Sequence, residues 1–208
     1  MRRRVIYFII GSIFLMLFLG FTFLARSQIF KQFDFDTTVR LQNHIPKKFD
    51  TIFSVFSLVG SVEVVSLVIL ATIIVSKKWH ALLIYIPFFT AHAVEILGKA
   101  IFHHPGPPFM FFRYNINFLF PSSYVQPGSS YPSGHSLRAL FLTLIFGYLV
   151  ATSKKLSKNF KLIFYLLLIF YDVIMLTSRV VLGEHWTTDV VGGAFLGISA
   201  GFFAFIFL

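Results

Sequence analysis

The chain has 208 residues, of which 57% are hydrophobic and 12% are charged, and its formal net charge is +10. A mean hydropathy of +0.81 is too high for a soluble domain of this length and indicates an integral membrane protein. The basic residues lie mostly beside apolar runs, where they orient a chain in the bilayer and contact anionic lipids, so we expect no nucleic-acid partner. The absence of cysteine excludes disulfides, thiolate metal sites and cysteine nucleophiles.

Apolar runs predict six membrane spans in one all-α bundle, a single polytopic domain formed by residues 1–208. Roughly 20 apolar residues, at ~1.5 Å per residue, cross a hydrocarbon core ~30 Å thick. The expected spans cover approximately residues 5–24, 55–75, 79–100, 134–151, 162–177 and 190–208.

The first run follows arginines at residues 2–4, as the apolar region of a signal peptide would. It is long for such a region, and Leu24-Ala25-Arg26 is a poor cleavage site, so we expect a retained span. The next segment, residues 26–51, mixes phenylalanines with charged residues. This mixture is typical of an amphipathic segment that lies in the membrane interface.

The basic clusters predict the orientation of the chain. With a cytoplasmic N-terminus, the short basic segments at 2–4, 77–78 and 154–161 all fall on the cytoplasmic side. An even number of spans brings the C-terminus to that side as well. The polar segments then meet on the extracytoplasmic face; they are residues 26–51, 103–132 and 178–189.

In the last expected span, Gly193, Gly197 and Gly201 recur at every fourth residue. Small residues at this spacing predict close packing against another helix. Such packing would also hold His185 and Asp189 in register with the fourth expected span.

Ionisable groups are most concentrated in residues 178–189, which we expect to form about three helical turns. His185 and Asp189 are four residues apart, so on a helix they share one face and the carboxylate holds one ring nitrogen. Arg179 lies on the other side of Gly183 and offers the rigid fork of donors that suits a phosphate or a carboxylate.

The segment 131–136 lies where a polar loop becomes a span. Pro132 and Ser133 signal a helix start, and free N–H groups at such an end bind anions. Gly134 allows a ligand to approach the main chain closely. The alternative is that Ser133 only caps the helix and that His135 is an ordinary interfacial histidine.

Lys99 closes the third expected span and shares a helix face with His92 and Glu95. It is therefore a candidate anion ligand, although neutralisation by Glu95 or extension of the side chain to the interface would also explain it. Glu63 and Asp172 fall inside spans and should face the bundle interior. The sequence indicates no partner for either.

Together these groups favour phosphoryl transfer without a metal or cofactor. His185 would be the nucleophile, with its Nδ1–H held by Asp189, and His135 would donate a proton to the leaving oxygen. Lys99, Arg179 and the N–H groups of the helix start would stabilise the phosphate oxygens. A zinc site is the competing interpretation, but the two cations would repel the metal.

These residues resemble the signatures of the type 2 phosphatidic acid phosphatase family, whose helical core is shared with vanadium haloperoxidases and bacterial acid phosphatases. The third signature is Ser-Arg, five residues, His, three residues and Asp. It is matched in full by Ser178, Arg179, His185 and Asp189. The second signature, Pro-Ser-Gly-His, is matched by residues 132–135, and the resemblance extends over about residues 99–197.

The first signature departs from the family pattern of Lys, six residues and Arg-Pro. Lys99 and Pro107 match it, but Gly106 occupies the place of the arginine. Loss of one charged contact to phosphate costs about 2 to 5 kcal/mol. Three side chains are candidate substitutes for the missing cation: Arg113, Arg138 and His104.

The resemblance implies a metal-independent phosphatase that acts on a lipid phosphate or a polyprenyl pyrophosphate through a phosphohistidine, at the extracytoplasmic face of the membrane. The substrate would keep its tail in the bilayer. Two alternatives stay open. One is a phosphotransferase that passes the phosphoryl group to a second acceptor, and the other is a non-catalytic binder or transporter of lipid phosphates.

Overall fold

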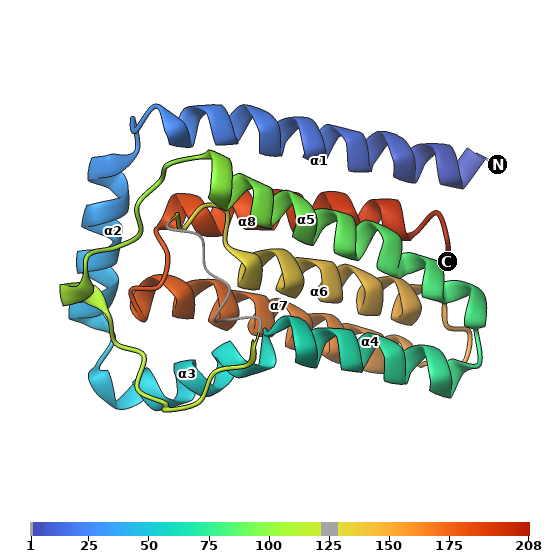
Figure 1. The fold of residues 1–208 in the computed structure, drawn as a ribbon. Helices are drawn as coiled ribbons and strands as arrows, with labels where there is room; N and C mark the ends of the chain where they lie inside the picture. Colours follow the sequence, from blue (N-terminus) through green and yellow to red (C-terminus); the bar gives the residue numbers. More distant parts are fainter. Residues whose placement is uncertain (1, 122–128) are drawn as a thin grey trace.

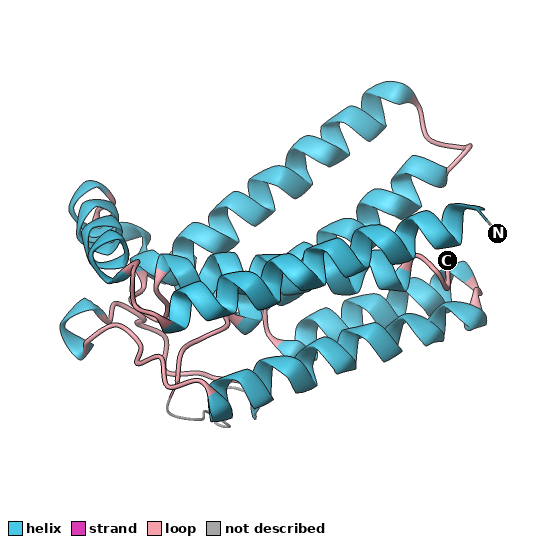
Figure 2. Cartoon of the chain, turned by 90° about the horizontal axis from the view of Figure 1, so that it is seen from above, coloured by secondary structure: helices cyan, strands magenta, loops and turns pink. Residues whose placement is uncertain are grey.

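The computed structural model describes residues 2–121 and 129–208, and all secondary structure in these residues is helical (Figure 2). The α-helices of the described chain are α1 (Arg2–Arg26), α2 (Lys31–His44), α3 (Asp50–Val59), α4 (Val62–Ser76), α5 (Tyr85–Ile101), α6 (Gly134–Thr152), α7 (Lys158–Val181) and α8 (Thr187–Ala204). Short 3₁₀ turns are η1 (Lys47–Phe49), η2 (Trp79–Ile84) and η3 (Phe109–Phe111). Part of the polar loop expected at 103–132 lies outside the described residues.

Five helical segments of the described chain are long and apolar enough to cross a membrane, which confirms the predicted polytopic all-α class. They are Arg2–Arg26, Trp79–Ile101, Gly134–Thr152, Lys158–Val181 and Thr187–Ala204. A sixth candidate is the pair Lys47–Val59 and Val62–Ser76, whose two parts are bent by 55°.

This bend divides the run that the sequence predicts as one span at 55–75. Ser61 begins α4 as its N-cap, and its hydroxyl accepts a hydrogen bond of 3.2 Å from the N–H of Val64. The carbonyl oxygen of Gly60, at the end of α3, accepts a hydrogen bond of 2.6 Å from Nε of Arg138 in α6. Because groups outside the helix satisfy the backbone here, the chain can change direction inside the apolar run.

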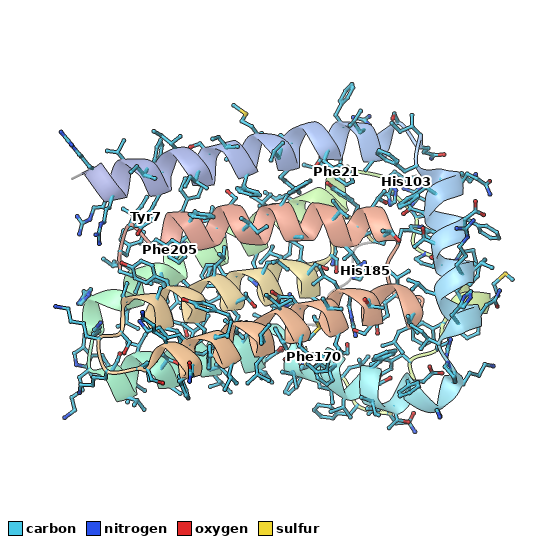
Figure 3. The ribbon with its side chains drawn as sticks, turned by 180° about the vertical axis from the view of Figure 1, so that it is seen from behind. Tyr7, Phe21, His103, Phe170, His185 and Phe205 are labelled. Atoms are coloured by element: carbon cyan, nitrogen blue, oxygen red, sulfur yellow. The ribbon has the colours of Figure 1, made fainter. Side chains whose placement is uncertain are left out.

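Helix α8 lies at the centre of the bundle and packs against both α6 and α1 (Figure 1). The two termini lie at the same end of the bundle as the α4–η2 turn and the α6–α7 loop, which carry basic clusters (Figure 1). At this end, Tyr7 and Tyr148 contact the ring of Phe205, with centroids 5.3 and 4.7 Å away (Figure 3). Helix α2 runs across the opposite end, where His103 and His185 lie (Figure 3).

The line of glycines on α8 faces α6, as the sequence predicts. A Cβ atom at Gly197 would lie 2.9 Å from the Cα atom of Leu137, and one at Gly193 would lie 3.1 Å from the carbonyl carbon of Ser133. Both separations are shorter than ordinary contacts, so a larger side chain would push the two backbones apart. The close approach holds the start of α6 against the start of α8.

One buried carboxylate holds α2 against the first turn of α8. Asp34 accepts hydrogen bonds from the N–H of Thr188 at 2.9 Å and from its hydroxyl at 2.7 Å. Burial raises the pKa of Asp34 above its ordinary value, although these two hydrogen bonds oppose the effect. Phe33 and Phe35 are exposed. In α2, the buried Asp34 is therefore directed towards the protein, while Phe33 and Phe35 keep much of their surface exposed.

We expect Asp34→Ala to lower the midpoint of thermal unfolding in detergent. The substitution leaves the buried N–H and hydroxyl of Thr188 without an acceptor, which costs about 1–3 kcal/mol for each group. Asp36→Ala is the matched control, because Asp36 is an exposed carboxylate of the same helix. Equal midpoints for the two variants would contradict the role assigned to Asp34.

Candidate active site

The stretch 178–189 is not one helix, so that prediction is wrong. Helix α7 ends at Val181 and α8 begins at Thr187. Between them, Gly183 adopts the left-handed conformation with φ of +68°, as is common for a glycine that ends a helix. The N–H groups of Glu184 and His185 then both donate to the carbonyl oxygen of Arg179, at 3.1 and 3.2 Å. This turn brings the end of α7 to the start of α8.

The turn nevertheless brings His185 and Asp189 together, as their spacing predicts. Nδ1 of His185 lies 3.5 Å from Oδ2 of Asp189, a charge contact at the limit of hydrogen-bond distance. The same oxygen accepts a hydrogen bond of 2.8 Å from the N–H of Trp186. Asp189 is fully buried and His185 is 8% exposed. The carboxylate is therefore fixed by the main chain, and the imidazole beside it retains some access.

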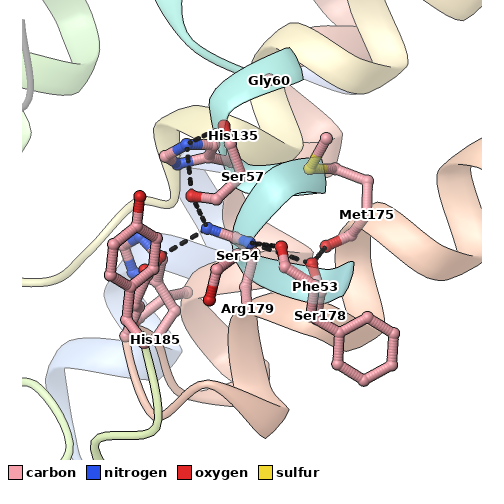
Figure 4. A network of polar contacts seen from close by, with 12 residues as sticks. Phe53, Ser54, Ser57, Gly60, His135, Met175, Ser178, Arg179 and His185 are labelled. Carbon is pink, nitrogen blue, oxygen red and sulfur yellow. Dashed lines mark hydrogen bonds and ion pairs between the residues drawn. The ribbon is translucent and has the colours of Figure 1, made fainter. Parts of the chain in front are cut away.

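Arg179 is completely buried, and its guanidinium is fully engaged (Figure 4). It donates to the hydroxyl of Ser57 at 2.6 Å, to the hydroxyl of Ser178 at 3.0 Å and to the carboxylate of Glu184. Nε2 of His135 lies 3.2 Å from the carbonyl oxygen of Ser57 and 3.4 Å from its hydroxyl. Ser57 thus joins the arginine of α7 to the histidine of α6.

Ser57 is a site residue that the sequence reasoning missed. It lies in α3, in the first part of the bent pair, and is a hydroxyl within an apolar run with no recognisable motif around it. Glu184 was missed as a partner as well, although it immediately precedes His185. Its carboxylate forms an ion pair with Arg179. A ligand anion that reaches Arg179 would compete with this carboxylate.

Helix α6 begins at Gly134, as the helix-start signal predicts. The hydroxyl of Ser133 is buried and makes no capping hydrogen bond, while its N–H donates to the carbonyl oxygen of Asp189 at 3.0 Å. The group closest to Gly134 is the Glu95–Arg138 pair, since a Cβ atom would lie 2.6 Å from Cδ of Glu95 and 2.7 Å from Nη1 of Arg138. The space that a side chain at Gly134 would fill is thus occupied by the carboxylate of Glu95 and the guanidinium of Arg138.

Near the end of α5, the carboxylate of Glu95 contacts three basic side chains. Its carboxylate accepts a hydrogen bond of 2.9 Å from Nζ of Lys99 and lies 2.9 Å from Nδ1 of His92. Nη1 of Arg138 is 3.7 Å away. Neutralisation of Lys99 by Glu95, one of the alternatives that the sequence left open, is therefore present in the structure. The carboxylate of Glu95 lies directly against Gly134, so Lys99, which donates to that carboxylate, is close to the start of α6.

The three candidate substitutes for a cation at Gly106 are found in different surroundings. Arg113 donates to both oxygens of Asp50, at 2.6 and 3.0 Å, so its fork is already occupied. Arg138 contacts the Glu95 carboxylate that Lys99 also contacts. His104 points its Nδ1 at Oδ1 of Asp189, 3.1 Å away.

The intramembrane Asp172 has a partner that the sequence did not indicate. The hydroxyl of Thr143 in α6 donates to its carboxylate at 2.9 Å. This contact joins α6 to α7 within the bundle and agrees with the expectation that an acidic residue in a span faces other helices.

A model of the PAP2 superfamily matches residues 79–208, and the three signature regions described above lie within this match. The chain belongs to the PAP2 superfamily. It is 32% identical over 123 residues to phosphatidylglycerophosphatase B of Bacillus subtilis (strain 168), a match that covers 59% of the chain and 55% of the relative. The chain thus spans about half of the length of this curated relative.

Two solved structures have the same fold. A crystal structure of the first transmembrane PAP2-type phosphatidylglycerolphosphate phosphatase from Bacillus subtilis superposes with a TM-score of 0.74 at 19% identity, over 93% of each chain. The crystal structure of Aquifex aeolicus LpxE superposes with a TM-score of 0.60 at 21% identity, over 82% of this chain and 93% of that one. The superfamily match over residues 79–208 confirms the family prediction made from the signatures, and the two solved structures show the fold.

We expect Gly183→Ala to lower the unfolding midpoint. A residue other than glycine at φ of +68° is strained by about 1–2 kcal/mol, and the added Cβ would also lie 3.0 Å from the backbone nitrogen of Phe112. Gly20→Ala in α1 is the control, since nothing lies within 4 Å of its Cβ position. If both variants unfold at the midpoint of the unsubstituted protein, the turn does not need glycine.

Proposed function

We propose that the chain hydrolyses a lipid phosphate or lipid pyrophosphate without a metal, through a phosphohistidine formed on His185. One observation carries the proposal: Asp189 contacts His185 through its side chain and the N–H of Ser133 through its carbonyl oxygen. The nucleophile and the anion-binding helix start are thereby held by one residue. Membership of the PAP2 superfamily supports the same chemistry.

In the first step, Asp189 holds the proton of His185 on Nδ1, which leaves the lone pair of Nε2 free to attack phosphorus. The bond from phosphorus to the lipid oxygen breaks, and that oxygen takes a proton from His135. In the second step, His135 takes a proton from water, the water oxygen bonds to phosphorus, and the P–N bond to His185 breaks. Inorganic phosphate leaves, and both histidines return to their initial state.

The charge on the transferring phosphoryl group would be stabilised by Arg179, by Lys99 and by the N–H groups at the start of α6. We propose Arg138 as the replacement for the cation missing at Gly106. It lies beside Gly134 and contacts the same carboxylate as Lys99, whereas the donors of Arg113 are held by Asp50. When phosphate binds, its oxygens would then take the place of the Glu95 carboxylate beside Lys99 and Arg138.

The site would face the extracytoplasmic side of the membrane. It lies at the bundle end opposite the termini, and the basic α4–η2 turn and α6–α7 loop lie with the termini (Figure 1). The positive-inside rule assigns that basic end to the cytoplasm. We propose a glycerophospholipid phosphate, such as the phosphatidylglycerophosphate of the relative's name, as the first substrate to test, and phosphatidic acid and polyprenyl pyrophosphate as the next.

We expect His185→Ala to reduce the release of phosphate by about a thousandfold or more, because the variant lacks the proposed nucleophile. The assay uses purified protein in detergent with EDTA and a panel of lipid phosphates, and it measures free phosphate. His103→Ala is the matched control, since His103 is an exposed histidine at the same end. Unchanged activity of His185→Ala would disprove the mechanism, and lipid binding without phosphate release by the unsubstituted protein would favour a binder.

A further inference from the structure

His104 makes a second imidazole contact to the carboxylate that holds His185. Asp189 has two side-chain oxygens, and each faces a different histidine: Oδ2 lies 3.5 Å from Nδ1 of His185, and Oδ1 lies 3.1 Å from Nδ1 of His104. The contact to His104 is the shorter of the two. His104 comes from the loop after α5, at the degenerate first signature, and not from the helix of Asp189.

The main chain of His104 is fixed by the segment that precedes the second signature. Its carbonyl oxygen accepts hydrogen bonds from the N–H of Ser130 at 2.9 Å and from the hydroxyls of Ser130 at 3.1 Å and Ser129 at 3.2 Å. The ring packs edge-on against Tyr131, with centroids 5.9 Å apart. These contacts determine where the imidazole points.

The residue after His104 is also tied to the third signature. Nε1 of Trp186 donates to the carbonyl oxygen of Pro105 at 2.9 Å. Trp186 directly follows the proposed nucleophile, and its own N–H donates to Asp189. The loop that carries His104 and the turn that carries His185 are therefore joined both by the side chain of His104 and by the indole of Trp186.

The geometry points to His104 as a positioning residue that holds Oδ1 of Asp189, so that Oδ2 stays directed at His185 during phosphoryl transfer. This inference rests on the proposed function. In this role Nδ1 of His104 faces the carboxylate of Asp189 at 3.1 Å and is not a ligand of the phosphate. Its contribution to the reaction passes through Asp189.

Charge supports this role. Burial lowers the pKa of His104, but the hydrogen bond to Asp189 and the negative charges of Asp189 in α8 and Asp34 in α2 outweigh that effect, so the pKa lies above its ordinary value. The phenol of Tyr131 also lies against the ring, and its hydroxyl is hydrogen bonded to Thr22 at 2.8 Å. His104 therefore keeps its proton to higher pH than a free histidine and pairs with the carboxylate as a cation.

Two substitutions separate positioning from packing. His104→Phe keeps a ring against Tyr131 but removes the nitrogen that faces Asp189. His104→Asn places an amide N–H near the position of Nδ1 and does not titrate. We expect kcat of the Phe variant to fall about tenfold to a hundredfold, as is found when a group that orients a functional histidine is removed, and kcat of the Asn variant to stay within about threefold of the unsubstituted protein. His103→Phe, at the neighbouring exposed histidine, should have little effect.

The pH profile supplies a signature that a purely structural role would not change. In the unsubstituted protein, Asp189 loses its cationic partner as the pH rises through the raised pKa of His104, whereas an asparagine at this position does not titrate. kcat of the unsubstituted protein should therefore decline through this pH range, and the Asn variant should lack that step. The inhibition constant for inorganic phosphate should stay within about twofold in both variants, because His104 does not touch phosphate.

Three outcomes would overturn the inference. They are a Phe variant with unchanged kcat, equal losses in the Phe and Asn variants, and weaker inhibition by inorganic phosphate at unchanged kcat, which would make His104 a phosphate ligand.

Histidine NMR gives a readout that is independent of activity. The titration midpoint of His104 should fall in Asp189→Asn, and an unchanged midpoint would also reject the contact. If the unsubstituted protein releases no phosphate, the proposed function fails, while the NMR result still decides the contact.

Discussion

The carboxylate of Asp189 is the constraint on which the rest of the site depends. A fully buried carboxylate is costly unless hydrogen bonds and cations surround it, and here the polar atoms of Asp189 contact groups from all three signature regions. The N–H of Ser133 binds its carbonyl oxygen, the N–H of Trp186 and His185 face Oδ2, and His104 faces Oδ1. Burial of this one residue therefore joins the three signature regions.

The cations at this end of the bundle follow the same physical rule, since charges close to the hydrocarbon core need opposite charges beside them. Arg179 pairs with Glu184, Arg113 with Asp50, and Lys99 and Arg138 share Glu95. The site is thus nearly neutral before a substrate arrives. A phosphate that enters would take over cations already paired, which makes exchange of carboxylate for phosphate part of binding in the proposed mechanism.

The sequence was sufficient to predict contacts that depend on the separation of residues along the chain. His185 and Asp189 meet at four residues' separation although the turn between them is not helical, and the glycines of α8 face α6 as their period predicts. It was insufficient where contact depends on packing between distant segments. Ser57 has the appearance of any hydroxyl in an apolar run, and Asp34 lies 154 positions before its partner Thr188. The break of the second run at Gly60 likewise depends on Arg138 of another helix.

The central claim is that His185 attacks phosphorus while Asp189 holds it. The most direct test is to stop the reaction with alkali during turnover of a lipid phosphate in EDTA, and to locate the phosphoryl group on the protein by mass spectrometry, since phosphohistidine survives alkali. We predict a phosphoryl group on His185, and none when Asp189→Asn has removed the carboxylate that orients the ring. A phosphoryl group on His135, or on any other side chain, would contradict the account.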